Sequence, residues 1–138
     1  VRMVAIPIHT INSGVIHGIA VGMVLPQVMK FNAEQEETNR IYAEVARKSG
    51  LAGPNSPDSE ATRNLIARVC EILKLANISS SLEDYGFVPS EINSLADAAQ
   101  EQWTASFNPR SINSSDFKNL YSLLFPTASC ENQVAQAN

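Results

Sequence analysis

Residues 14–32, GVIHGIAVGMVLPQVMKFN, form the stretch that decides the fold. Between His17 and Asn32 only Gln27 and Lys30 interrupt a run of apolar and small residues. A helix that is apolar all round is buried on all sides. This stretch therefore predicts the central helix of an all-helical domain. At about 15 residues the apolar run is too short to span a membrane, so no membrane association is expected.

His17 is the polar group at the N-terminal end of this predicted helix. The free backbone amides and the positive end of the helix dipole disfavour an imidazolium there and favour neutral imidazole, the form that binds metals. His17 is therefore a candidate metal ligand. The other histidine, His9, lies eight residues earlier. That spacing alone is weak evidence for a site and favours ordinary packing roles for the two histidines.

The composition sets limits on the class of protein. A chain of 138 residues with 44% hydrophobic residues makes one domain with a real core. A net charge of -4 argues against a nucleic-acid surface, where a basic stripe is expected. The apolar run after Arg2 is too short and broken for a signal peptide, which makes the cytoplasm the expected location. Because the first residue is Val1 rather than Met, we expect a fragment, a processed product or an excised domain.

Apolar residues keep helical spacing in four further segments, which predicts helices at residues 33–48, 57–76, 89–106 and 115–125. The residues expected to face inward are Ile41, Tyr42, Val45 and Ala46 in the second of the five predicted helices, Ile92, Leu95, Ala96, Ala99 and Trp103 in the fourth, and Phe117, Leu120, Tyr121 and Leu124 in the last. The prediction is an all-α bundle of about five helices over residues 14–126, with residues 127–138 as a tail.

Residues 1–13 leave two alternatives open. Val4, Ile6 and Ile8 alternate as in a strand, but the segment reads equally well as the ragged end of a preceding helix. Its apolar start suggests that it once packed against something upstream. We therefore interpret residues 1–13 as the remnant of an upstream segment.

Four blocks of sequence together resemble the helical domain of the iron-containing (group III) alcohol dehydrogenases. HGIAVGMVLPQVMKFN is similar to the family pattern of His-Gly, small residues, Leu-Pro-x-Val-Met and Phe/Tyr-Asn. IYAEVARKSG, SSSLEDYGFVPSEINSLADAA and FNPRSINSSDFKNLYSLLF follow in the family's order. In the last block we expect Arg110 to hold carbonyl groups at a helix C-terminus. The resemblance covers residues 14–126.

The resemblance implies a two-domain oxidoreductase that acts on an alcohol or aldehyde. In that family an N-terminal α/β domain binds NAD(P), and the C-terminal helical domain carries a divalent metal, iron or zinc. The metal acts as a Lewis acid on the substrate oxygen and is held by one Asp and three His. The last of these histidines, the one in the His-Gly pair, maps onto His17.

The departures from the family pattern concern the site itself. The Asp and first His ligands lie upstream of this sequence, and the middle His ligand falls on Met3. If the intervening loop were two residues shorter, His9 would match a further histidine near the substrate, but the ligand position would then be Ala5. One imidazole cannot hold a catalytic divalent ion, since such sites need about three protein ligands. We therefore predict neither a stably bound metal nor bound NAD(P), no catalytic or cofactor-binding residue in this chain, and no activity from the chain alone.

Two interpretations remain. The chain is either the C-terminal helical domain of an iron-containing alcohol dehydrogenase-like enzyme or a free-standing, non-catalytic interaction module descended from one. In both, we expect apolar surface to lie uncovered at residues 1–8 and along the small-residue face of Gly18 and Gly22. The expected partner is a second copy of the chain or the missing nucleotide-binding half.

Overall fold

The computed structural model describes residues 1–12 and 14–125, and in these ranges the chain forms helices and no strand. The six α-helices are α1 (Arg2–Ile11), α2 (His17–Ala33), α3 (Glu36–Lys48), α4 (Asp58–Leu75), α5 (Ile92–Gln100) and α6 (Ser114–Ser122). Three 3-10 turns are η1 (Glu83–Tyr85), η2 (Pro89–Glu91) and η3 (Trp103–Phe107). The predicted all-α class is confirmed. The predicted tail at residues 127–138 lies outside the described residues.

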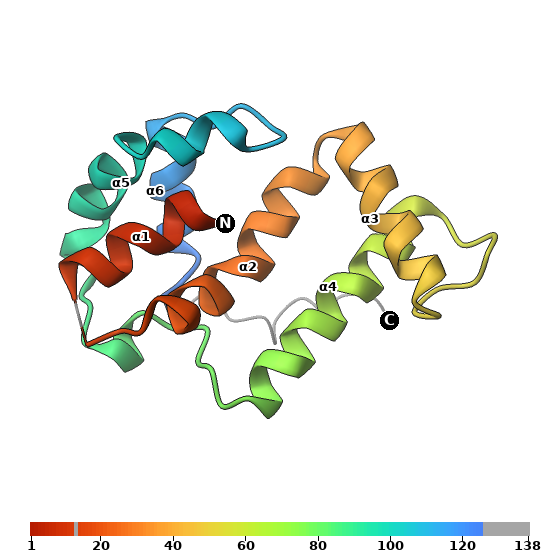
Figure 1. Cartoon of the computed structure of the whole chain (residues 1–138), viewed down its shortest axis with the longest axis horizontal. Helices are drawn as coiled ribbons and strands as arrows, with labels where there is room; N and C mark the ends of the chain where they lie inside the picture. Colours follow the sequence, from red (N-terminus) through yellow and green to blue (C-terminus); the bar gives the residue numbers. More distant parts are fainter. Residues whose placement is uncertain (13, 126–138) are drawn as a thin grey trace.

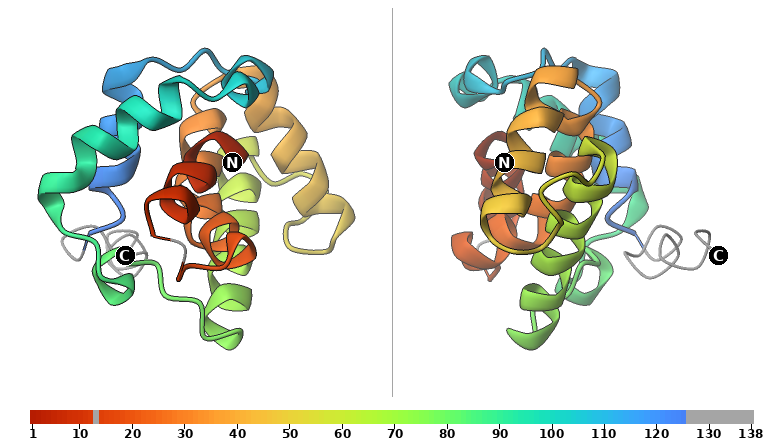
Figure 2. Two further views of the ribbon diagram at one scale, coloured as in Figure 1. Left: turned by 60° about the vertical axis from the view of Figure 1, so that its left-hand side comes forward. Right: turned by 90° about the vertical axis from the view of Figure 1, so that its right-hand side faces the viewer.

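Helix α2 lies in the middle of the molecule, as its apolar composition predicts. Figure 1 shows α1, α5 and α6 on one side of it and the α3–α4 hairpin on the other. Helices α1, α3 and α4 all contact α2, and the further views in Figure 2 show the same arrangement. The α2 side chains Ala20, Met23, Val24 and Val28 are almost completely buried. No helix among the described residues has the length and apolarity needed to cross a membrane.

Gly22 allows α4 to approach α2 closely. A Cβ atom at this position would lie 3.0 Å from Cδ2 of Leu73 and 3.3 Å from Cδ1 of Ile78. Gly18 has no such role, because a Cβ atom there would meet nothing within 4 Å. The expected uncovered face of small residues is therefore wrong at Gly22, where α4 covers the helix.

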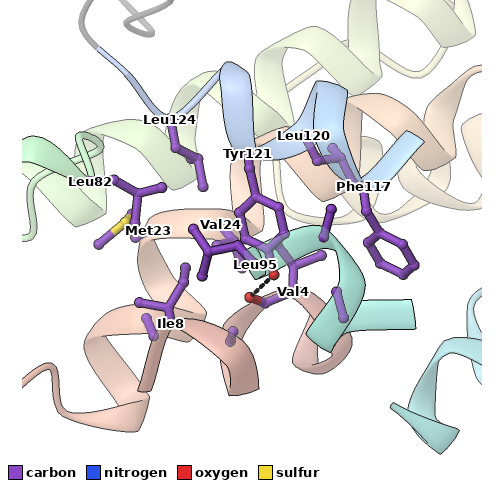
Figure 3. Packing of buried hydrophobic residues seen from close by; sticks show 14 of the residues in the cluster. Val4, Ile8, Met23, Val24, Leu82, Leu95, Phe117, Leu120, Tyr121 and Leu124 are labelled. Carbon is purple, nitrogen blue, oxygen red and sulfur yellow. Dashed lines mark hydrogen bonds between the residues drawn. The ribbon is translucent and has the colours of Figure 1, made fainter. Parts of the chain in front are cut away.

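The N-terminal segment is a helix and belongs to the core of this domain. Met3, Val4 and Ile8 of α1 are each at most 2% exposed. The Tyr121 hydroxyl of α6 donates a hydrogen bond of 2.9 Å to the Val4 carbonyl (Figure 3). The expectation that residues 1–8 leave apolar surface uncovered is therefore wrong. The spacing of these residues also fits a helix, since positions three and four apart share a helical face.

Two predicted inward faces are wrong in part. In α3 the side chains of Ile41 and Val45 are 51% and 45% exposed. Ala46, which was also predicted to face inward, is buried against α4 together with Ala43. Because alanine side chains are small, they allow α3 and α4 to pack closely. This close contact determines which face of α3 is buried. Trp103 is 69% exposed, because α5 ends at Gln100 and the chain continues as the turn η3. The predicted helix over residues 89–106 is thus a shorter helix between two 3-10 turns.

Helix α6 closes the main core in the predicted orientation. Its inward residues Phe117, Leu120 and Tyr121, and Leu124 just beyond it, are at most 3% exposed. The start of α6 is fixed by a reciprocal cap. The Asn113 side chain accepts a hydrogen bond from the backbone N–H of Asp116, and the Asp116 carboxylate accepts one from that of Asn113.

Candidate metal centre

His17 is the first residue of α2, and its side chain is half-buried at the edge of the main core. The flanking residues are exposed: Ile16 is 67% exposed and Gly18 lies open. The imidazole therefore stands at the first turn of the central helix. This is the position that the sequence predicts for the candidate ligand.

The structure brings His9 close to His17, which the spacing of the two residues did not predict. Their ring centroids are 6.1 Å apart, with an angle of 72° between the ring planes. The Nδ1 atom of His9 lies 2.7 Å from the Val15 carbonyl oxygen. A carbonyl oxygen only accepts, so Nδ1 carries the proton and Nε2 keeps a free lone pair in the neutral ring. The turn between α1 and α2 thus fixes the tautomer of His9.

The described residues do not fit a resident catalytic metal. Within residues 1–12 and 14–125, no group of three or more His, Cys, Asp or Glu side chains could hold a metal ion. Met3 and Ala5, the two alternative positions of the middle ligand, are 2% and 0% exposed in the hydrophobic core. A catalytic site needs about three protein ligands and an open position. His17 and His9 alone fall short of this number.

The Asn-Pro-Arg segment has a structural role at the C-terminal end of α2. Arg110 Nη1 donates a hydrogen bond of 2.8 Å to the Phe31 carbonyl, which confirms the predicted role of Arg110. The guanidinium also pairs with Glu34 at 2.6 Å and lies 3.9 Å from the centroid of the Phe31 ring. Asn32 is buried and exchanges two side-chain hydrogen bonds with Asn108.

Known structures share this fold. A crystal structure described as 1,3-propanediol oxidoreductase superposes with a TM-score of 0.81 and 21% sequence identity. The match covers 90% of this chain and 32% of that one. An alcohol dehydrogenase from an archaeal halo-thermophilic Red Sea brine pool, in its H277A mutant form, gives a TM-score of 0.78 at 19% identity, covering 88% and 31%. At these identities the likeness shows the fold.

Two curated relatives are similar in sequence. An NADPH-dependent butanol dehydrogenase from Clostridium saccharobutylicum is 31% identical over 114 residues, which are 79% of this chain and 28% of the relative. A lactaldehyde reductase from Escherichia coli K12 is 30% identical over 105 residues, 76% of this chain and 27% of the relative. The chain therefore spans less than a third of the length of either relative.

The family model for the C-terminal part of the Fe-containing alcohol dehydrogenases matches residues 8–125. This match includes His17, the Arg110 network and every α-helix except most of α1. With that coverage and the shared fold, the chain belongs to the Fe-containing alcohol dehydrogenase family, as a counterpart of its C-terminal helical part.

Proposed function

We propose that this chain is the helical half of an NAD(P)-dependent oxidoreductase that acts on alcohols or aldehydes, and that it is inactive by itself. The match of residues 8–125 to the C-terminal part of the family carries this proposal. The names of the two relatives state activities on butanol and lactaldehyde, which support the alcohol or aldehyde class. The inactivity is inferred from the ligand set, which in the described residues offers two neighbouring imidazoles.

In this proposal a nucleotide-binding half supplies the NAD(P) site and the remaining metal ligands. This chain contributes His17 at the start of α2, and the helical core holds that side chain in place. The chain's own residues provide no step of hydride transfer. Activity therefore requires both halves in one assembly.

Co-expression with the nucleotide-binding half of the butanol dehydrogenase tests the proposal. NADPH oxidation in the presence of butanal is expected from the co-purified pair and not from the chain alone. His17→Ala should abolish that activity, while the control Lys118→Ala, an exposed change on α6, should keep it. NADPH oxidation by the isolated chain would contradict the proposed inactivity. A pair that co-purifies but is inactive would contradict the half-enzyme role.

One observation favours the second candidate, a non-catalytic helical interaction module. Helix α1 closes the main core with Val4 and Ile8, so this core is complete among the described residues without a second half. A module of this kind would be folded and stable alone. If the chain captures no nucleotide-binding half when the two are co-expressed, this second function is supported.

A further inference from the structure

A half-open groove of about 330 Å³ lies between α2 and α6, away from the two histidines. Its size is at the lower end of the range for small-molecule sites. The polar residues that line it are Gln27, Lys30, Glu34, Arg110, Asp116 and Asn119. The buried side chain of Leu120 adds an apolar wall.

Gln27 forms part of this groove and is the residue that points to a ligand. It is only 5% exposed as a whole residue, and its side-chain amide makes no hydrogen bond within residues 1–12 and 14–125. The amide atoms are not among the fully buried polar atoms that lack a partner, so they keep access to the surface. A primary amide offers two donors and an acceptor. The amide is not sealed inside the protein, because it lines the groove. Its hydrogen-bonding capacity is therefore directed toward whatever occupies the groove.

Two cations, Lys30 and Arg110, and two carboxylates, Glu34 and Asp116, line the groove. Arg110 pairs with Glu34, and the Asp116 carboxylate caps α6 by accepting from the Asn113 backbone. Lys30 has no ion pair within residues 1–12 and 14–125 and stands three residues from Gln27, on the same face of α2. The groups left unpaired are thus one ammonium, the Gln27 amide and the Asn119 amide.

We propose that this groove binds a carboxylate group. The Lys30 ammonium and the Gln27 amide N–H groups are donors suited to the two carboxylate oxygens, and a hydrogen bond from an ammonium to a carboxylate is one of the stronger kinds. The Asn119 amide supplies a further donor from α6, and Leu120 contacts the aliphatic part of the ligand. The carboxylate belongs either to a free small organic acid or to the side chain of a peptide.

Titration of the full chain, followed by 1H–15N NMR, tests this proposal with three probes. Succinate represents the free acid, an end-blocked Gly-Asp-Gly peptide represents the side chain, and succinamide is the neutral control. We expect saturable shifts of the Gln27, Lys30 and Asn119 signals by succinate or the peptide, with a Kd of about 1 mM or lower. Which of the two binds more tightly identifies the source of the carboxylate. Equal shifts with succinamide, or no saturation by either acid, would overturn the proposal.

Variants separate a binding role from a structural one. Lys30→Gln and Gln27→Leu should each weaken carboxylate binding by about tenfold, because each removes a donor to the ligand. Lys118→Gln, which removes an exposed lysine of α6 outside the groove, should leave binding unchanged. Gln27→Leu should also leave the thermal midpoint unchanged, since the amide makes no hydrogen bond within residues 1–12 and 14–125 that the change would remove. Equal weakening in Lys118→Gln would show charge screening and contradict the site.

Discussion

Tyr121 links the last helix to the first inside the main core. Its ring is fully buried, and its hydroxyl donates to the Val4 carbonyl at 2.9 Å. Burial raises the pKa of Tyr121 above its ordinary value, because the phenolate would lose its hydration. A group with a raised pKa in the folded state stabilises the fold below its unfolded pKa and loses that contribution as the pH rises. The contribution of Tyr121 to stability is therefore lost in the alkaline pH range.

Tyr121→Phe should be less stable than the parent chain at pH 7 by about 1 kcal/mol, because the Val4 carbonyl loses its donor. Above the tyrosine pKa of about 10 the unfolded parent chain ionises while the buried hydroxyl does not. The parent should then lose about 1.4 kcal/mol relative to the variant by pH 11. Urea unfolding of both chains at pH 7 and pH 11 measures this difference. A difference that does not change with pH would contradict the account.

At the scale of elements, Arg110 connects the segment before α6 to the end of α2 through the Phe31 carbonyl, the Phe31 ring and Glu34. Arg110→Ala should lower the free energy of unfolding by about 1–3 kcal/mol, since the part-buried Phe31 carbonyl loses its charged donor. Arg68→Ala is the matched control. Its exposed pair with Glu71 in α4 should contribute almost nothing. Chemical denaturation compares the two, and equal effects would show that the Arg110 contacts do not hold the elements together.

The two helical glycines of α2 give a second test at this scale. Gly18→Ala should stabilise the chain, by at most about 1 kcal/mol, because alanine favours the helix and the site is open. In Gly22→Ala the new Cβ would lie 3.0 Å from Leu73, so repacking should cancel the gain or reverse it. Thermal unfolding of both variants measures the contrast. Equal stabilisation by both would mean that α2 and α4 are not closely packed.

The helices also differ in how well the pattern of apolar residues predicts their buried faces. The inward faces of α2 and α6 follow from their apolar residues, because large side chains there have one core to enter. In α3 the same argument selected Ile41 and Val45 along with Ala46, whereas the close contact with α4 buries only the small Ala46 of these three, together with Ala43. The pairing of His9 with His17 depends on the turn between two helices, which no spacing rule gives. No Pro or Gly lies near Gln100, so the sequence does not indicate that α5 ends there, before Trp103.

At the scale of the whole molecule, the apolar residues of α1 that were expected to drive dimerisation are buried in the core of the domain. The exposed aromatic side chains are instead Trp103 and Phe107, in a T-shaped pair on η3, which contacts α1. Dimerisation remains a prediction, and the exposed pair of Trp103 and Phe107 is now the expected contact between the two copies. Light scattering at high concentration should give twice the chain mass of 15.0 kDa, and Trp103→Ser should restore the monomer. A parent chain that is monomeric at every concentration would refute the dimer.

The described residues form a closed helical core with an incomplete metal centre at its edge. The most direct test is the metal content of the purified chain after loading with iron or zinc and dialysis. Because His17 has only His9 beside it in the described residues, we predict far less than one equivalent of metal per chain. About one equivalent in the parent chain, lost in His17→Ala, would contradict the account.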